Sequence, residues 1–255
     1  MGIVGCNLKG GLGNYMFQIA ATVAYGLEHH KDPTFNLNSA QQIHRHTSEY
    51  KTNLFRSLNE GCFKADAVYY EPSFSYNKIP PSEGNLWLEG YFQSELYFIG
   101  REESIGQIFS ETPDIKSYID NKYENLLEEG VTSVHVRRAN YLDNPNHPAQ
   151  SMDYYSACME ELGGKFLVFS DDPAWCKENF KDYNATFIEG EEDFIDLHLM
   201  ARCTNNIIAN SSFSWWGAWL NKNKSKKVTA PARWFEGHAS RNDTSTLLPE
   251  EWICM

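Results

Sequence analysis

The chain of 255 residues carries 22 Lys plus Arg against 34 Asp plus Glu, a formal net charge of −12, and 42% of its residues are hydrophobic. This length holds one large domain or two smaller ones, with ample core in either case. The acidic balance argues against general nucleic-acid binding, because that affinity comes largely from basic side chains that neutralise phosphates. The acidic net charge is still compatible with a local basic site that binds a nucleotide.

The sequence contains no apolar run long enough to cross a bilayer and no pattern typical of a secretory signal. We therefore expect a cytoplasmic protein with at most peripheral membrane association. Its six cysteines are scattered without any Cys-x-x-Cys pair. That spacing favours reduced, mostly buried thiols over disulfides or zinc.

A strand, a glycine-rich turn and a helix are predicted at the start of the chain. Residues 3–6 are a short apolar run, the turn is Lys9-Gly10-Gly11-Leu12-Gly13-Asn14, and a helical pattern covers 15–30. Glycines let the backbone approach a ligand closely, and a helix N-terminus offers free N–H groups to an anion. The turn matches neither the dinucleotide fingerprint nor a P-loop, so a tight βα turn without a ligand is an equal alternative.

The rest of the first half is less regular. A strand is expected over 34–38, irregular structure with room for a hairpin over 41–85, a strand over 87–92, and helices over 95–109 and 114–129. Gly130 then marks a boundary between two lobes. We predict an N-terminal lobe of residues 1–129 and a C-terminal lobe of residues 130–255.

The second half alternates between predicted strands and helices. Strands are expected over 131–136, 166–170, 185–188, 206–209 and 227–230, and helices over 152–162, 174–180, 191–203 and from 215 onward. Such alternation is typical of an α/β fold with a parallel sheet.

Two adjacent arginines follow the strand expected at 131–136. Arg137 and Arg138 would lie at the carboxyl end of a buried strand, where α/β proteins bind their ligands. Because a guanidinium group is permanently charged and matches phosphate oxygens, the pair suggests a clamp for a diphosphate. Exposed arginines in surface ion pairs are the alternative. Successive strand residues point to opposite faces, so only one of the two can bind phosphate unless the strand has already ended.

Several blocks of the sequence, in this order, resemble glycosyltransferase family 11, the α-1,2-fucosyltransferases. The blocks are Gly10-Gly11-Leu12-Gly13-Asn14-Tyr15-Met16-Phe17-Gln18, Gly90-Tyr91-Phe92-Gln93-Ser94-Glu95, His135-Val136-Arg137-Arg138, Asp153-Tyr154-Tyr155, Phe169-Ser170-Asp171-Asp172-Pro173 and Asn210-Ser211-Ser212-Phe213-Ser214-Trp215-Trp216-Gly217-Ala218-Trp219-Leu220. The His-x-Arg-Arg block is shared with α-1,6- and protein O-fucosyltransferases. Together the blocks extend from about residue 5 to about residue 235.

The resemblance implies a GT-B-like α/β fold of two Rossmann-like lobes, with the nucleotide sugar held mainly by the C-terminal lobe and the acceptor on the N-terminal side. It also implies an inverting transfer of L-fucose from GDP-β-L-fucose to a galactose 2-hydroxyl of a glycan, with no cofactor and no essential metal. The sequence contains no Asp-x-Asp, the usual carboxylate pair for a metal-bound diphosphate. Asp171-Asp172 is expected instead to cap a helix that begins at Pro173.

Candidate nucleotide ligands follow from the same resemblance. Arg137 ranks first for the phosphate, and Arg138 is either a second ligand or structural. His135 is expected to orient the nucleotide or contact guanine, with a satisfied core histidine as the alternative. Asp196 is expected to accept hydrogen bonds from the guanine edge, with an exposed helix charge as the alternative.

Two further groups complete the predicted substrate site. Ser211, Ser212 and Phe213 precede or begin a helix whose N–H groups can cradle a phosphate, and helix capping by Ser211 is compatible with that role. In the N-terminal lobe, the candidates are Gly11, Gly13 and Asn14.

The catalytic base is the uncertain part of the predicted site. The family motif normally continues Arg-Arg-Gly-Asp-Tyr, whereas this chain has Ala139-Asn140-Tyr141. An amide cannot accept a proton as a carboxylate does, so Asn140 either positions the loop or marks a slow enzyme; Asp143 and His147 are the substitutes nearby. Three alternatives therefore stand: another GDP-sugar transferase, a catalytically silent nucleotide-sugar-binding protein, and a dinucleotide oxidoreductase, whose fingerprint is absent.

Overall fold

The computed structural model describes residues 2–38, 41–42, 47–127 and 130–255. The chain divides into two compact units: an N-terminal unit of Met1–Thr112 with Asn242–Pro249, and a C-terminal unit of Pro113–Arg241 with Glu250–Met255. The boundary predicted between residues 129 and 130 falls beside 128–129, which lie outside the described residues. In the structure, the two units meet in the chain between residues 112 and 113, earlier than predicted. Residues 242–249 also belong to the N-terminal unit, although they lie near the end of the chain.

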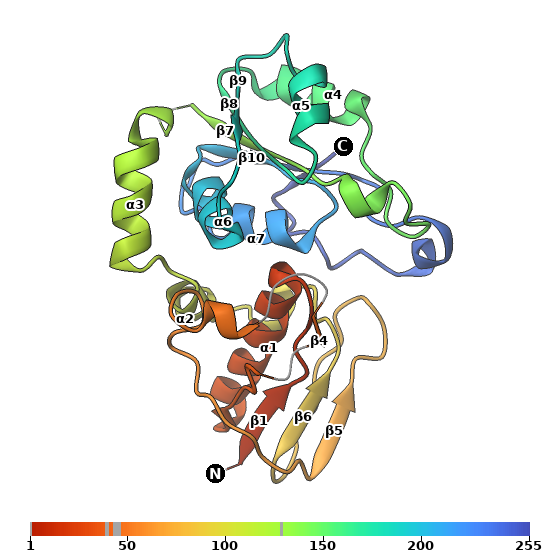
Figure 1. The fold of residues 1–255 in the computed structure, drawn as a ribbon. Helices are drawn as coiled ribbons and strands as arrows, with labels where there is room; N and C mark the ends of the chain where they lie inside the picture. The colour runs from red at the N-terminus through yellow and green to blue at the C-terminus, as the bar shows by residue number, and fades with distance from the viewer. Residues whose placement is uncertain (1, 39–40, 43–46, 128–129) are drawn as a thin grey trace. The chain divides into compact units, whose positions relative to one another are not determined.

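The N-terminal unit is built on a four-stranded sheet in the order β3-β1-β6-β5. The strands are β1 (Ile3–Cys6), β3 (Asp32–Pro33), β5 (Ala67–Tyr70) and β6 (Leu86–Glu89), and all their pairings are parallel. Helix α1 (Leu12–His29) connects β1 to β3 and lies along this sheet (Figure 1). Its apolar side chains, including Tyr15, Met16 and Phe17, are fully buried. The predicted opening of strand, glycine-rich turn and helix is thus present.

Smaller elements complete this unit. They are β2 (Lys9–Gly10), paired with β4 (Gln41–Gln42), the 3-10 turns Thr47–Tyr50 and Glu95–Tyr97, and helix α2 (Glu102–Ile108). The strand expected at 34–38 is wrong, because β3 ends at Pro33 and Phe35 forms only an isolated bridge to Glu60. No hairpin joins β5 to β6, which run parallel. The helix expected over 95–109 is divided into the 3-10 turn Glu95–Tyr97 and α2, and Gly100, with a φ of 77°, lies between them.

The C-terminal unit contains a six-stranded sheet in the order β12-β11-β10-β7-β8-β9. Its strands, parallel throughout, are β7 (Thr132–Val136), β8 (Phe166–Ser170), β9 (Ala185–Ile188), β10 (Asn205–Ile207), β11 (Val228–Ala230) and β12 (Ile253–Cys254). The helices are α3 (Pro113–Tyr123), α4 (Met152–Leu162), α5 (Pro173–Asn179), α6 (Asp193–Arg202) and α7 (Ser212–Trp219). Apart from β12, these strands were predicted from the alternation of the sequence.

Strand β8 shows why this sheet is covered on both faces. Leu167 and Phe169 pack into one buried cluster, which draws on α3 and α6, whereas Phe166 and Val168 pack into a second cluster with α4 and α5. Successive strand side chains point to opposite faces, so an uninterrupted apolar strand requires helices on both sides. Helix α3 belongs to this unit because its apolar side chains complete the first of these clusters.

Within the described ranges, no helix is both long enough and apolar enough to span a membrane.

Candidate functional site

Strand β7 lies inside the C-terminal sheet, between β10 and β8, and is buried along its whole length. It ends at Val136, so Arg137 and Arg138 already belong to the connection that follows the carboxyl end of the strand. The restriction that only one arginine can face a ligand applied to a continuing strand. Because the strand has ended before Arg137, the restriction does not apply. The direction of each arginine side chain is instead set by the residues that it contacts.

Arg137 is held by a carboxylate from the neighbouring strand. Its Nη1 lies 2.9 Å from Asp171 Oδ2, and Asp171 Oδ1 accepts a hydrogen bond of 2.8 Å from the Arg138 backbone N–H. Asp171 follows β8, whose Ser170 is in register with Val136 of β7. Two strands that end at one edge thus place opposite charges together. The arginine side chain keeps 23% of its surface exposed, so it remains accessible to a ligand.

Arg138 is directed toward helix α5 instead. Its Nε lies 3.3 Å from Asp172 Oδ2, and its guanidinium carbon lies 4.1 Å from the centre of the Trp175 ring. Asp172 Oδ1 also accepts the Trp175 backbone N–H at 3.2 Å, so the predicted helix cap at Pro173 is confirmed. Packed between a carboxylate and an indole ring, Arg138 anchors α5 to the strand edge.

Tyr141 closes the loop after the arginines. Its ring lies 5.6 Å from the Arg137 guanidinium carbon, and its hydroxyl donates a hydrogen bond of 3.1 Å to the carbonyl oxygen of Asn210. The other neighbour of the ring is His147, stacked at 5.2 Å. Burial raises the pKa of the Tyr141 hydroxyl to about 12, so it stays protonated at neutral pH. This tyrosine links the Arg137 loop to the turn before α7.

The three candidates for the catalytic base have different surroundings. Asn140 lies in the 3-10 turn Ala139–Tyr141 and is exposed, and Asp143 is exposed two residues after that turn. His147 is partly buried between Tyr141 and Phe235, and burial lowers the pKa of its imidazole. Its Nδ1 has no hydrogen-bond partner among the residues that the structure describes. A neutral imidazole of this kind can accept a proton.

His135 occupies the last-but-one position of β7 and is buried. Its ring contacts Phe213 edge-on at 5.5 Å. Burial, followed by the charge of Arg137, lowers the imidazole pKa to about 3, so the ring is neutral at physiological pH. Within the described part of the chain, its Nδ1 has no partner. A buried polar atom without a partner is uncommon in folded proteins, so His135 does not match the expectation of a satisfied core histidine.

Helix α7 begins beside the same strand edge, after β10. Ser211 is its N-cap and accepts the Phe213 backbone N–H at 3.3 Å, so the capping role expected for Ser211 is observed. The side chain of Asn210 donates to the carbonyl oxygens of Pro148 and Trp234, at 3.0 and 2.9 Å. These bonds fix the direction in which the first N–H groups of α7 point.

Asp196 lies in the first turn of α6 and is partly buried. Burial, then the negative charges of Glu191 and Asp193, raises its pKa to about 7. Its Oδ1 is buried and has no donor among the described residues. This carboxyl oxygen can therefore accept a hydrogen bond from a ligand, because no described residue donates one to it. An exposed helix charge, the alternative expected from the sequence, does not describe it.

The predicted site residues of the N-terminal unit surround the start of α1. Gly11 is the N-cap, Gly13 and Asn14 belong to the first turn, and Asn14 Oδ1 accepts a hydrogen bond of 2.7 Å from Gln93 Nε2. Gly10 adopts a φ of 94°, and a Cβ there would meet the Asn14 side chain at 2.3 Å. The turn therefore requires glycine at this position. These residues belong to a different compact unit from Arg137, His135 and Asp196.

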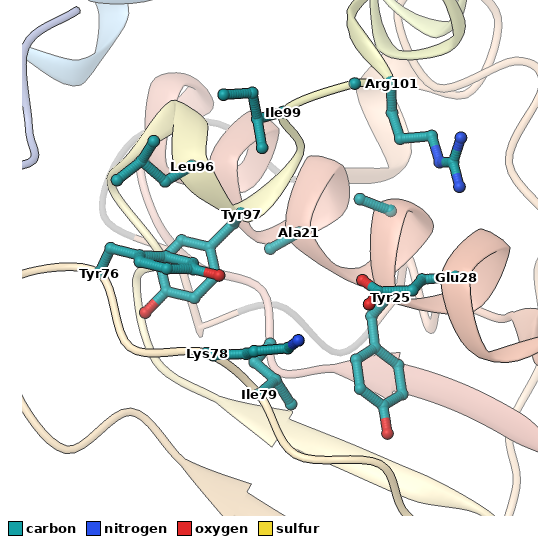
Figure 2. Close-up of a pocket in the computed structure, with 12 residues that line it drawn as sticks. Ala21, Tyr25, Glu28, Tyr76, Lys78, Ile79, Leu96, Tyr97, Ile99 and Arg101 are labelled. Carbon is teal, nitrogen blue, oxygen red and sulfur yellow. The ribbon is translucent and has the colours of Figure 1, made fainter.

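The N-terminal unit also contains an open hollow of about 450 Å³, which Figure 2 shows in close-up. Tyrosines and charged side chains surround it: Tyr25, Glu28, Tyr76, Lys78, Tyr97 and Arg101. None of the residues predicted for the site lines it. As for metals, no group of three or more His, Cys, Asp or Glu side chains is arranged to hold an ion in the described ranges.

Sequence reasoning missed the partners of the predicted residues. It treated Asp171 only as part of a helix cap, and it assigned no role to Tyr141. A signal for Asp171 was present, because two acidic residues follow β8 as two arginines follow β7, and parallel neighbours end at one edge. For Tyr141, which bonds to Asn210 across a long stretch of chain, no local pattern could have indicated the contact.

Comparison with known proteins places these features in context. A family model described as "Glycosyl transferase family 11" matches residues 2–255. The chain is 31% identical to the Escherichia coli O-antigen biosynthesis glycosyltransferase WbnK, covering 96% of this chain and 98% of that protein. It is 32% identical to an Escherichia coli alpha-1,2-colitosyltransferase, covering 99% of each.

Among solved structures, the fold is similar to that of the NodZ α-1,6-fucosyltransferase from Bradyrhizobium, which was co-crystallised with GDP. The TM-score is 0.57 at 14% identity, over 85% of this chain and 92% of that one. At this identity the likeness concerns the fold alone. Together with the parallel sheets and covering helices of both units, it confirms the predicted GT-B-like α/β fold.

Proposed function

Because the chain belongs to glycosyltransferase family 11, as its sequence blocks predicted, we propose that it transfers L-fucose from GDP-β-L-fucose to the 2-hydroxyl of a galactose residue in a glycan or oligosaccharide. A glycosyltransferase of family 11 is what the family membership establishes. The fucose donor, the galactose acceptor and the linkage are the proposal.

One observation supports the donor side most directly: the arrangement of Arg137 at the carboxyl edge of the C-terminal sheet. In a chain of net charge −12, this arginine side chain is partly exposed, oriented by Asp171 and flanked by the Tyr141 ring. In the transfer, the bond between the sugar C1 and the β-phosphate oxygen breaks, and negative charge accumulates on the departing GDP. A preorganised donor at such a charge contributes roughly 3–4 kcal/mol to the transition state.

The start of α7 provides a second group of donors for the diphosphate. Its first N–H groups are not used inside the helix, and the helix dipole favours an anion there. Ser211 caps the helix through its hydroxyl, and Asn210 is fixed by two carbonyl oxygens and by Tyr141. In this proposal, Arg137 and the α7 N-terminus share the phosphates, whereas Arg138 positions α5.

Asp196 and His135 support a guanine nucleotide. Guanine presents two neighbouring N–H donors, and the Asp196 carboxyl has a buried oxygen that lacks a donor in the described chain. A carboxylate that pairs with both donors would form charge-assisted hydrogen bonds, and the ligand would compensate the burial that raises its pKa. His135, neutral and with an unpartnered Nδ1, offers one further polar contact.

The acceptor hydroxyl loses a proton as its oxygen attacks C1 from the face opposite to the leaving GDP. Asn140 cannot take that proton. His147 is neutral at physiological pH because burial lowers its pKa, and Asp143 is an exposed carboxylate in the same loop. We propose that Asn140 positions the loop and that one of these two groups accepts the proton.

A second donor follows from the relatives. One curated relative is named as an alpha-1,2-colitosyltransferase, and colitose is fucose without its 3-hydroxyl. The same clamp on the GDP moiety would serve either sugar, because the two donors differ only at that hydroxyl. A colitosyltransferase is therefore the alternative within the family.

Calorimetry with GDP, GDP-fucose and GDP-mannose, followed by a GDP-release assay over galactose-terminated acceptors, tests the proposal. We expect GDP and GDP-fucose to bind, GDP-mannose to bind more weakly, and release of GDP to depend on a galactose acceptor with a free 2-hydroxyl. Turnover of GDP-colitose without turnover of GDP-fucose would assign the alternative donor. Binding without turnover of any donor would identify a silent nucleotide-sugar-binding protein and refute the enzyme.

A further inference from the structure

Three parallel strands of the N-terminal unit end at one edge of its sheet, and a polar side chain lies at or directly after the end of each. Asn7 comes directly after β1, Glu89 is the last residue of β6, and Glu71 comes directly after β5. β6 pairs with both of the others, so the three positions are neighbours. Ligands of open α/β sheets bind outside the carboxyl ends of the strands. This edge is therefore where a ligand of this unit is expected.

Gln18 makes the edge rigid. The side chain is fully buried on α1, its Oε1 accepts the Lys9 backbone N–H at 3.0 Å, and its Nε2 donates to the carbonyl oxygens of Lys9 and Gly90, at 3.3 and 3.2 Å. One amide thus joins the turn after β1 to the turn after β6. Because these backbones are fixed to each other, the side chains of Lys9, Glu89 and Tyr91 project from a single preorganised frame.

The Glu89 carboxylate is oriented but not neutralised. Its Oε1 accepts the Trp87 indole N–H at 2.8 Å, and its Oε2 accepts the Asn7 amide at 3.3 Å. Both donors are neutral, and among the described residues no cation pairs with this carboxylate. Since each carboxylate oxygen can accept more than one hydrogen bond, Glu89 retains capacity for hydroxyl donors of a ligand.

Lys9 and Tyr91 lie next to each other at the same edge. Lys9 Nζ is 4.8 Å from the centre of the Tyr91 ring, and that ring is 38% exposed. Glu71 accepts the backbone N–H groups of Tyr91 and Phe92, at 2.7 and 3.0 Å. The ammonium group makes no hydrogen bond within the described chain, so its donors are open to a ligand. An exposed aromatic surface beside a cation and an oriented carboxylate suits a sugar ring.

We propose that Lys9, Glu89 and Tyr91 recognise the acceptor saccharide, and that this site of the N-terminal unit takes a neutral, galactose-terminated sugar. The inference rests on the proposed function and identifies its acceptor-binding residues. Neighbouring sugar hydroxyls donate to Glu89 and accept from Lys9, while the apolar C–H face packs against Tyr91. A neutral ligand fits best because, among the described residues at this edge, the carboxylates Glu89 and Glu71 accompany the cation Lys9, whose charge acts on Glu71.

The test uses the whole chain and lactose as a galactose-terminated probe. The variants Glu89→Gln, Lys9→Met and Tyr91→Leu are compared with matched controls in the same unit. Glu83→Gln alters an exposed carboxylate before β6, at the opposite edge of the sheet. Lys78→Met removes a lysine of the hollow in Figure 2. Readouts are the KM for lactose with GDP-fucose, saturation-transfer NMR of lactose in the presence of GDP, GDP affinity and Tm.

We expect Glu89→Gln and Lys9→Met to raise the lactose KM about tenfold or more, the scale of a lost hydrogen bond to a charged group. Tyr91→Leu should raise it through the lost packing surface, and all three variants should weaken the NMR transfer. GDP affinity and Tm should stay at the wild-type values, and the controls should behave as wild type. Lactose binding that survives all three substitutions would overturn the proposal, as would lack of lactose binding by the wild type. If the wild type binds lactose but transfers no fucose, the proposed donor fails, and the NMR comparison alone decides the acceptor site.

Discussion

The two sheets end in edges of different chemistry, although both are parallel and both were expected to face substrate. At the C-terminal edge, Arg137 is held by Asp171 and Arg138 by Asp172, so the geometry is fixed by ion pairs. At the N-terminal edge, the buried amide of Gln18 fixes the backbone, and Glu89 is oriented by neutral donors. Charge is preorganised at one edge, and neutral hydrogen bonding dominates at the other.

This difference corresponds to what each edge is proposed to bind. A departing diphosphate carries formal charge, and stabilising it requires permanent cations whose desolvation is already compensated. A sugar carries none, so its recognition depends on oriented acceptors and donors on a rigid frame. Variants that remove the ion pairs at the C-terminal edge should affect the diphosphate, and variants that remove the Gln18 hydrogen bonds at the N-terminal edge should affect the sugar.

The largest effect is expected at the charged edge. Arg137→Lys should reduce kcat about 100-fold or more, because a lysine offers a point charge and cannot reproduce the planar fork. The measurement is the initial rate of GDP release together with GDP affinity. Arg138→Lys is the matched control: its loss should be mainly in Tm, since Arg138 packs on Trp175 and Asp172. Full activity of Arg137→Lys would refute a bidentate phosphate contact.

At the neutral edge, Gln18→Leu should lower the free energy of unfolding by about 2–3 kcal/mol, because the part-buried backbone of Lys9 and the buried carbonyl of Gly90 lose their partners. It should also raise the acceptor KM while GDP affinity stays constant. Denaturant unfolding and steady-state kinetics provide both values. Thr22→Val is the control on the same buried helix: it removes one hydroxyl, which bonds to the Gln18 carbonyl, and should leave the acceptor KM unchanged.

Asp196 predicts a pH dependence with a definite sign. Its pKa is raised from 3.8 to about 7 in the folded chain, so folding favours the protonated form, and stability falls as pH rises from about 4 to about 7. Asp196→Asn should therefore be more stable than wild type at pH 8 and equal to it near pH 3. Each pKa unit corresponds to about 1.4 kcal/mol, which sets the upper scale in thermal unfolding.

The same carboxyl should link GDP binding to pH. If the ionised Asp196 accepts the guanine donors, GDP affinity of the wild type should rise between pH 6 and pH 8. Asp196→Asn should lose that dependence and discriminate less between GDP and ADP. Calorimetry with both nucleotides at two pH values is sufficient. Unchanged discrimination in the variant would assign Asp196 a structural role.

A smaller effect is expected at Asn140. Since this residue is exposed and we propose a positioning role, Asn140→Asp should change kcat less than about threefold, whereas restoring a true general base would raise it about 10²–10⁴-fold. The pH–rate profiles of Asp143→Asn and His147→Ala then identify the base. The variant that loses the acidic limb of the profile marks the replaced group.

No effect is expected from removal of divalent metal. Arg137 and the α7 N-terminus are proposed to neutralise the diphosphate without a cation, so excess chelator should leave turnover unchanged. The assay is GDP release with chelator and with added manganese. Activity that disappears with chelator and returns with manganese would contradict the metal-free proposal.

Much of the fold could be predicted from the sequence because it is encoded locally. The strands at Phe166–Ser170 and Ala185–Ile188 and the helix at Met152–Leu162 occur where the apolar patterns predicted them. The family resemblance came from short blocks whose residues are adjacent in the chain. By contrast, β5 (Ala67–Tyr70) was missed, because this edge strand is largely exposed and lacks a buried alternating face.

The sequence by itself determined which chemical groups the chain can offer: two arginines after a buried strand, a glycine turn before a helix, and an asparagine where the family has a carboxylate. Only the tertiary structure decided how those groups are directed. Asp171 reaches Arg137 because two parallel strands end in register, and Gln18 joins Lys9 to Gly90 across a long interval of chain. Such contacts depend on strand order and burial, which are long-range properties that no local pattern of residues specifies.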